Sequence, residues 1–295
     1  MKKTLPVILL LSLFFAQDSF AATQTSTSSQ LLPPPVSVIN WHKQVRTVNM
    51  RGLYMSMTPK TDAVGAMTIT GGGMLMDYND GWSEHFGGSY NLTMMGMTGK
   101  SEDQYSTNSM GTFMFNLNPN IVWTPINGEK KDIAGEVTKT GFSLALYGGY
   151  GMSLMSFGTS QDIIPTQTTR TSDSMSMSMF SMDYGVVMEV PIAWWISIMP
   201  SYNITKYTGG SVSVGGESYS IDGADLPAQA IFGADILVRP MKLNPNLLVS
   251  LAALTGLVSG NSDNSNYNST MIMLGIQYEW GKHYSSTFIS PGITK

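Results

Sequence analysis

The chain has 295 residues, of which only 12% are charged, about half the share that is usual in soluble domains. Its formal net charge of −4 excludes a strongly basic surface, which argues against a nucleic-acid partner. It contains no cysteine, which excludes a disulfide framework and a lipid-anchored cysteine.

The amino terminus predicts export with a cleaved signal peptide. Lys2 and Lys3 form a short basic region, and the apolar core from Leu5 to Ala16 is too short to span a membrane as a helix. Ser19-Phe20-Ala21 then supplies small residues at the positions that a signal peptidase reads, so we expect residues 1–21 to be removed. A buried N-terminal helix is the alternative interpretation.

Residues 22–47 predict a flexible N-terminal segment in the periplasm. They begin rich in Ser and Thr and then carry Pro33-Pro34-Pro35, a composition that does not nucleate a packed unit. The alternative is a plug that enters the interior of the domain that follows.

From residue 48 onward, apolar and polar residues alternate with the period of two that is typical of β-strands. The clearest alternation lies in 174–206, where a corner at Pro191 separates two strands. Each is longer than a typical soluble strand and nearly long enough to cross a bilayer at a tilt. We predict ten strands in all, over residues 48–58, 64–77, 83–97, 109–125, 141–157, 174–190, 192–206, 226–239, 247–258 and 269–281.

Low charge without long apolar runs is typical of a membrane barrel, in which one strand face meets lipid and the other a polar interior. We therefore predict an all-β fold, a single antiparallel transmembrane β-barrel of ten strands over residues 48–281. A secreted β-sandwich is the alternative, but it should carry more charge and shorter strands.

An even strand number places both termini on the periplasmic side. Three short turns are then periplasmic, at 78–82, 190–191 and 240–246. Four longer polar segments are external, at 98–108, 158–173, 207–225 and 259–268. Two connections break this asymmetry, because 59–63 is a short external turn and 126–140 is a long periplasmic loop.

Five tryptophans fall at the predicted periplasmic strand ends. Indole rings prefer the headgroup level of a bilayer. We therefore expect lipid as a partner and an interface aromatic girdle made of Trp82, Trp123, Trp194, Trp195 and Trp280.

The strand faces can be assigned where the alternation is clean, as in 141–157, 174–190 and 269–281. Strands 48–58 and 64–77 have no clean parity, and Gly71-Gly72-Gly73 in the second of them predicts a bend or bulge. Charges in a narrow interior must be paired or hydrated. They either fill a closed interior as an ion-pair and water network or set the selectivity of a small pore. The inward candidates for such a lumen site are Asp183, Glu189, Asp235, Arg239 and Glu279.

The signal peptide, strands ending in motifs such as LGIQYEW (274–280), and Gly-aromatic strands such as YGGYGMSL (147–154) make the chain resemble a Gram-negative outer-membrane β-barrel protein. The resemblance is architectural and implies residence in the cell outer membrane. Such barrels commonly end on an aromatic residue, whereas here the residues 282–295 follow. This C-terminal tail is either free or contributes an extra strand, and 207–225 could hide another, so twelve strands is the alternative count.

The residue types needed for catalysis do not cluster in the sequence. Of the three histidines, His42 and His283 lie in segments outside the strands, and His85 follows Trp82 at a periplasmic strand end. Known barrel hydrolases and proteases instead work at the outer rim. We therefore predict no enzymatic activity and no cofactor.

Methionine is the unusual component, with 23 residues. M-x-M spacing places two thioethers on one strand face, and thioethers are soft ligands suited to Cu(I). Met175, Met177 and Met179 are therefore candidate metal ligands. The alternative is that methionine, as an unbranched apolar residue, simply suits lipid-facing or core positions. Both interpretations predict the same alternation.

Together these features predict an integral outer-membrane barrel that acts as a small channel or transport-type barrel for small solutes. One alternative is a non-conducting structural or surface-interaction barrel whose external loops bind a ligand. Another is a methionine-rich barrel that handles Cu(I). The solute or surface ligand and the oligomeric state are left open.

Overall fold

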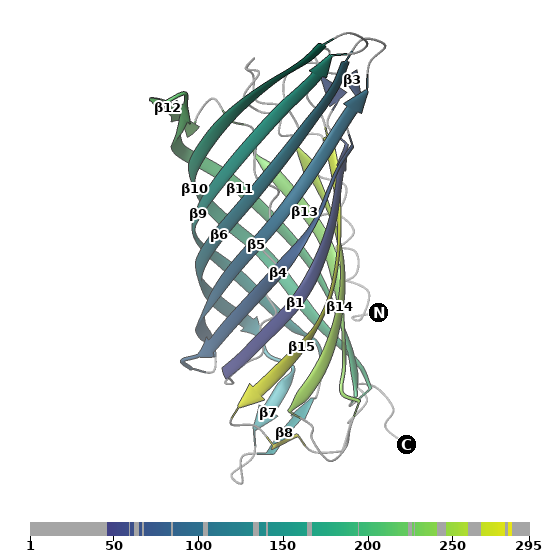
Figure 1. The fold of residues 1–295 in the computed structure, drawn as a ribbon. Helices are drawn as coiled ribbons and strands as arrows, with labels where there is room; N and C mark the ends of the chain where they lie inside the picture. Colours follow the sequence, from purple (N-terminus) through teal and green to yellow (C-terminus); the bar gives the residue numbers. More distant parts are fainter. Residues whose placement is uncertain are drawn as a thin grey trace.

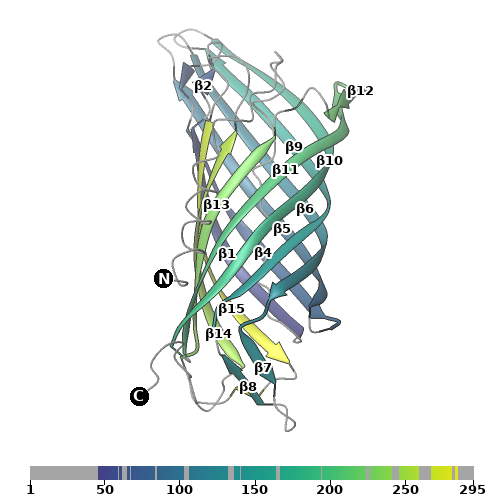
Figure 2. The same cartoon turned by 180° about the vertical axis from the view of Figure 1, so that it is seen from behind.

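Ten long strands form one closed antiparallel barrel in the described part of the chain (Figure 1, Figure 2). They are β1 (Arg46–Thr58), β4 (Thr68–Gly81), β5 (Phe86–Glu102), β6 (Ser106–Ile126), β9 (Ser143–Ile163), β10 (Gln167–Ala193), β11 (Ile196–Val214), β13 (Gln229–Val238), β14 (Leu247–Val258) and β15 (Tyr267–Trp280). Their order around the wall is β10-β9-β6-β5-β4-β1-β15-β14-β13-β11, and a pairing between β10 and β11 closes the sheet.

The computed structural model describes fifteen stretches of the chain, which are residues 46–58, 60–61, 65–66, 68–83, 85–102, 106–131, 136–139, 141–163, 167–193, 195–223, 226, 228–240, 246–258, 267–280 and 283–284. The predicted signal peptide, residues 1–21, lies outside them, as do residues 22–45 of the predicted N-terminal segment 22–47. Arg46 and Thr47, the last two residues of that segment, belong instead to β1. Among the described residues, no helix is long and apolar enough to cross a membrane.

The barrel confirms the predicted fold class, and each predicted strand overlaps one strand of the wall. The differences are at the ends. β10 begins at Gln167 rather than 174, and β11 continues to Val214 rather than 206. The pairing between β10 and β11 continues as far as Met175 and Val214, beyond the residues whose alternation was used to predict the strand ends. The closed wall has ten strands and not the alternative twelve.

Short strands extend the barrel at both ends. β12 (Glu217–Asp222) pairs only with β11, β2 (Lys60–Thr61) pairs with β3 (Gly65–Ala66), and β7 (Glu129–Lys131) pairs with β8 (Glu136–Lys139). β16 (His283–Tyr284) lies parallel to β8. The segment 207–225 and the C-terminal tail thus each contribute a short strand, but neither strand enters the closed wall.

Four tryptophans mark one end of the barrel, which we call the tryptophan end. Trp82 and Trp195 lie in the β4–β5 and β10–β11 turns, whereas Trp123 and Trp280 pair with the residues that open β5 and β1. Each of the four is 44–56% exposed. Trp194 lies outside the described residues. The opposite end, which carries β12 and β3 (Figure 1), is called the loop end.

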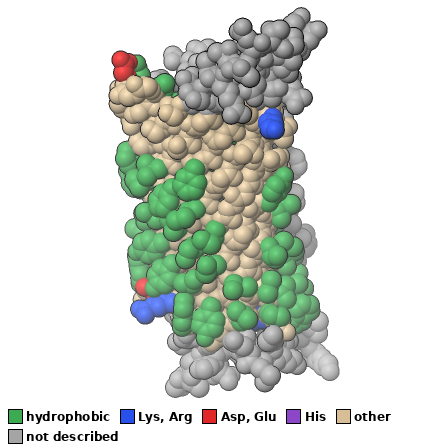
Figure 3. Space-filling model, viewed as in Figure 1, with side chains coloured by type: hydrophobic (Ala, Val, Ile, Leu, Met, Phe, Trp, Pro, Cys, Tyr) green, Lys and Arg blue, Asp and Glu red, His purple; other side chains and the backbone are tan. Residues whose placement is uncertain are grey.

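The two faces of the wall carry different side chains. Buried and exposed residues alternate along the strands, and the exposed positions hold large apolar groups such as Tyr54, Ile121, Tyr150 and Leu274. Figure 3 shows these groups spread over the wall, with described charged side chains near its two ends. Such an outward band matches the hydrocarbon layer of a bilayer. The predicted faces of 141–157 and 269–281 agree with the observed burial.

The Gly71-Gly72-Gly73 segment is not a bulge. β4 keeps an unbroken register with both β1 and β5 through these residues, so the predicted bulge is wrong. The glycines instead permit a close approach, because a Cβ added at Gly73 would lie 2.0 Å from the carbonyl oxygen of Met94. At Gly71 and Gly73, β4 therefore places no side chain on its inward face.

We expect Gly73→Ala to destabilise the barrel by about 1–3 kcal/mol, because backbone atoms of β5 must shift to admit the methyl group. Gly96→Ala is the matched control, since Gly96 lies on β5 opposite Gly72 and an added Cβ there meets no atom within 4 Å. Urea unfolding of barrels refolded into lipid vesicles, followed by tryptophan fluorescence, measures both. Equal losses in the two variants would argue against the close approach.

Candidate functional site in the barrel lumen

The lumen is the candidate site. Its described buried side chains form a polar zone, a methionine zone and a second apolar cluster of Val122, Ala145, Tyr147, Val187, Met199, Leu237 and Leu248. The zone toward the tryptophan end, the polar zone, is lined by buried polar and charged side chains. These are Thr47, Asn49, Arg51, Asp77, Asn79, Ser89, Asn91, Asn116, Asn118, Asn120, Ser181, Asp183, Glu189, Asn203, Thr205, Asp235, Arg239, Gln277 and Glu279. Strand alternation places those on strands on the inward face, and Arg239, in the turn that follows β13, is buried beside them.

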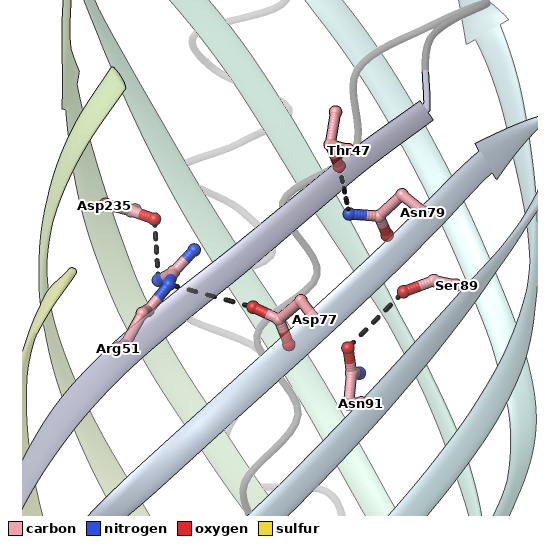
Figure 4. A network of polar contacts seen from close by, with 7 residues as sticks. All are labelled: Thr47, Arg51, Asp77, Asn79, Ser89, Asn91 and Asp235. Carbon is pink, nitrogen blue, oxygen red and sulfur yellow. Dashed lines mark hydrogen bonds and ion pairs between the residues drawn. The ribbon is translucent and has the colours of Figure 1, made fainter. Parts of the chain in front are cut away.

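An ion-pair cluster around Arg51 crosses the polar zone (Figure 4). The Arg51 Nη1 atom on β1 lies 2.8 Å from Asp235 Oδ2 on β13, and its Nε atom lies 3.7 Å from Asp77 Oδ2 on β4. All three side chains are almost fully buried. β13 is separated from β1 by two strands of the wall, so Arg51 joins parts of the barrel that no ladder connects.

A second cluster lies nearer the tryptophan end. Arg239 Nη2 donates a hydrogen bond of 3.3 Å to Glu279 Oε2, and Gln277 Nε2 donates one of 3.1 Å to the other carboxylate oxygen. The structure thus brings together Arg239 and Glu279, two of the candidates from the sequence. Asp235, a third candidate, belongs to the Arg51 cluster.

Asp183 and Glu189 are the other two candidates. Asp183 on β10 is buried and accepts hydrogen bonds from the hydroxyl groups of Thr205 and Ser181. Glu189 is also buried, six positions further toward the tryptophan end of β10. The five candidates therefore all lie on the inward face, spread over β10, β13 and β15 and the turn that follows β13.

Sequence reasoning missed Arg51 and Asp77 because their strands showed no clean parity. A signal was nevertheless present, since a charged residue within a membrane-spanning strand is strongly disfavoured on the lipid face. Arg51 alone would have assigned the odd positions of β1 to the lumen, and Asp77 would have done the same for β4. The observed burial has this parity in both strands.

The buried charges of the described residues are unbalanced. They comprise two arginines, Arg51 and Arg239, against five carboxyl groups, those of Asp77, Asp183, Glu189, Asp235 and Glu279. The formal charge of the lumen is therefore −3. A low-dielectric wall strengthens the field of such charges within the interior. The lumen thus favours cations over anions.

Several lumen amides and hydroxyls have hydrogen-bonding atoms that no other described protein group satisfies. Examples are both amide atoms of Asn49, the Oδ1 atoms of Asn116 and Asn118, the Nδ2 atom of Asn91 and the hydroxyl of Ser250. A buried polar atom without a partner costs about 1–3 kcal/mol. Such a set is stable only when hydrated, so the polar zone is suited to hold water.

The methionine zone lies toward the loop end. It consists of the buried residues Leu53, Met55, Met57, Ile69, Leu75, Met95, Met97, Met114, Met155, Phe157, Met177, Met179, Tyr207, Leu226, Ile231, Ala252, Leu254, Met271 and Met273. Ten of these nineteen residues are methionines, and the partly buried Met110 and Met175 pack against them. All three methionines of the candidate metal series thus face inward.

The described histidine side chain, that of His85, does not contribute to the lumen. His85 lies in the β4–β5 turn at the tryptophan end, where its Nδ1 atom is 2.8 Å from the carbonyl oxygen of Thr124. His42 lies outside the described residues. No group of three or more His, Cys, Asp or Glu side chains that could hold a metal ion occurs among the residues described.

Comparison with solved structures places this fold among outer-membrane barrels. The outer membrane protease OmpT from Escherichia coli matches with a TM-score of 0.50 and 8% identity, over 82% of this chain and 99% of that one. The translocator domain of the autotransporter NalP from Neisseria meningitidis matches with a TM-score of 0.45 and 10% identity, over 81% and 90%. An outer-membrane channel from Pseudomonas putida F1 matches with a TM-score of 0.39 and 8% identity, over 88% and 100%.

No protein-family model and no curated protein sequence matches the chain. At such low identities the structural matches establish the fold alone. The chain has the fold of a Gram-negative outer-membrane β-barrel, and its outward apolar band suits that membrane. A likeness in fold does not give a function, so the function must be argued from the lumen.

We expect Arg51→Met to destabilise the barrel by about 3–5 kcal/mol, because two buried carboxyl groups lose their shared cation. The triple variant Arg51→Met, Asp77→Asn, Asp235→Asn removes all three charges and should recover most of the loss. Urea unfolding in lipid vesicles measures both variants. A triple variant as unstable as the single one would show that lost packing of the arginine, and not uncompensated charge, causes the effect.

Proposed function

We propose that the protein is an integral outer-membrane barrel of the transport type, which passes small solutes through its lumen with a preference for cations. The observation that carries the proposal is the polar zone, where a formal charge of −3 coincides with polar atoms that require water. Apolar packing would be equally stable or better, so a charged interior whose polar atoms require water favours a passage for polar solutes.

The Arg51 cluster would be the constriction of this path. Its guanidinium group lies between Asp77 and Asp235 and so occupies the interior between β4 and β13. Because these side chains and those of the methionine zone are almost fully buried, a solute passes only when the Arg51 cluster opens and the methionine side chains move aside. The barrel would therefore conduct weakly and admit only small solutes.

The second candidate is a non-conducting barrel that binds a ligand at the loop end. The observation in its favour is the β11–β12 hairpin, which rises beyond β13 and exposes Val214 and Tyr219. The Tyr219 hydroxyl donates a hydrogen bond to the Glu217 carboxylate, which raises the pKa of the tyrosine. Apolar side chains exposed on a protruding hairpin are typical of contact surfaces.

We propose no enzymatic activity for the barrel. The fold likeness to a protease gives no role to any residue here. Of the histidines, His85 lies at the tryptophan end, away from the loop end, where β12 lies and where we place the external medium. Proton transfer by a nucleophile and base pair requires both groups within hydrogen-bonding reach.

Planar-bilayer recordings test conduction. We expect small, steady, cation-selective openings from the wild type and larger openings from the triple variant of the Arg51 cluster, because that variant removes the ion pairs across the lumen. Asp183→Asn should lower the cation preference, measured as a shift in reversal potential under a salt gradient. Glu217→Gln, outside the lumen, is the matched control and should leave the reversal potential near the wild-type value.

The absence of openings from both the wild type and the triple variant would exclude the transport proposal and favour the non-conducting barrel. Openings whose ion preference does not respond to Asp183→Asn would show that the polar zone does not set the selectivity.

Orientation follows from the tryptophan girdle and the loops. We expect an epitope placed between Gly215 and Gly216, in the β11–β12 turn, to bind antibody on intact cells. An epitope placed after Lys131, between β7 and β8, should bind only after the outer membrane is permeabilised. The opposite result would reverse the orientation.

A further inference from the structure

Four methionines form a continuous row across the inner wall near the loop end. Met95 on β5 is directly opposite Met114 on β6, Met114 is opposite Met155 on β9, and Met155 is opposite Met177 on β10. We call this row the methionine ladder. Its members are 0–4% exposed. Residues directly opposite on one face of neighbouring strands have Cβ atoms about 4.5–5.5 Å apart. Each thioether of the row is therefore within reach of the next, and Met114 and Met155 at its centre each have a methionine on both sides.

The surroundings of the methionine ladder supply more sulfur, and no side chain of β4 lies beside Met95. Met97 lies two residues from Met95, and Met179 two residues from Met177, on the same inward faces. Next to Met95 on the other side lies Gly73, so β4 places no side chain there. Neighbouring thioethers of the row can thus turn toward a shared ion without displacing a branched side chain on β4.

The along-strand series Met175, Met177 and Met179 is not the centre of this arrangement. On β9, Met175 is opposite Phe157 and Met179 is opposite Ser153, whereas Met177 is opposite Met155. Only Met177 belongs to the methionine ladder. The register between neighbouring strands, which cannot be predicted from the sequence, places these methionines side by side.

We propose that the methionine ladder is a binding site for a soft monovalent metal ion, Cu(I) or Ag(I). Thioethers are soft and neutral ligands, which select Cu(I)-type ions over Zn²⁺, Mg²⁺ or Ca²⁺. Among the described residues, no group of three or more His, Cys, Asp or Glu side chains is present that would recruit a harder ion. A cation bound by neutral ligands in an apolar zone needs charge compensation, and the five carboxyl groups of the polar zone supply it through the low-dielectric interior.

The proposal goes beyond the proposed function and does not depend on it. Binding at the methionine ladder requires no open pore, so a barrel that fails to conduct could still bind the metal. If the barrel conducts but does not bind Ag(I), the transport proposal stands and only the proposed metal site is excluded.

The test uses the full mature protein in detergent micelles with Ag(I) nitrate in chloride-free buffer. We expect saturable binding by isothermal titration calorimetry. In spectra of protein labelled with ¹³C at the methionine methyl groups, the signals of Met95, Met114, Met155 and Met177 should shift together. Zn²⁺ should shift none of them.

Met114→Leu combined with Met155→Leu keeps the apolar volume and should weaken Ag(I) binding by about tenfold or more, since two soft ligands are lost. The matched control is Met94→Leu combined with Met182→Leu, on β5 and β10. These methionines face outward, with exposed fractions of 37% and 41%. The control should bind Ag(I) as the wild type does.

Wild-type affinity in the Met114, Met155 variant would overturn the proposal, as would methyl shifts of equal size at the inward and outward methionines. The heat-dependent gel mobility of each variant reports whether its barrel is folded. Should the double Leu variant fail to fold, norleucine incorporation in place of methionine removes every sulfur at nearly constant volume. Retained binding in the norleucine protein would then exclude the site.

Discussion

Closure of the sheet through the β10–β11 ladder is the constraint on which the rest of the barrel depends. In hydrocarbon, a backbone N–H or C=O group without a partner is too costly to tolerate, so every wall strand needs a neighbour on both sides. Each of the ten strands has them. Once the sheet is closed, the period of two sends every second side chain into the lumen whatever its chemistry. The seven buried charges and the inward methionines share one interior for this reason.

The relation between the two faces of the wall reverses along the barrel. Toward the tryptophan end, outward apolar groups such as Tyr184 accompany inward polar groups such as Asp183. Toward the loop end of β10 the outward residues are polar, as at Ser174 and Ser176, and the inward residue Met177 is apolar. This reversal marks the level at which the wall leaves hydrocarbon, because above it the outward face meets water and the interior must supply the apolar packing.

The reversal also explains how much of the molecule could be predicted from the sequence. The strands and the faces of β9 and β15 followed from alternation, because polar or small inward residues there contrast with lipid-facing ones. In β1 that contrast fails, since the outward Met50 and the inward Met55 are the same residue type. The inward and outward faces could not be assigned where the lumen is itself apolar. Arg51 was therefore not recognised as a lumen residue.

Pairing across the barrel was beyond the reach of sequence for a different reason. Arg51 and Asp235 are 184 positions apart and lie on strands that share no ladder. Their contact depends on the width of the lumen and on the stagger of the whole sheet. The same holds for the methionine ladder, because a shift of one residue in a single pairing would turn one of its members toward the outside.

Apolar packing accounts for the position of the methionine zone but not for its chemistry. Burial of a methionine side chain costs about 1.5–2 kcal/mol of rotamer entropy, against about 0.5–1 for leucine or isoleucine. Ten buried methionines therefore cost roughly 10 kcal/mol more than branched residues in the same places. The outward methionines carry no such penalty, because lipid leaves their rotamers free. Only the inward set needs a compensating benefit, and methionine offers two that leucine lacks, a deformable side chain and a soft sulfur ligand. Both properties suit a lumen that passes a solute or binds a soft metal ion.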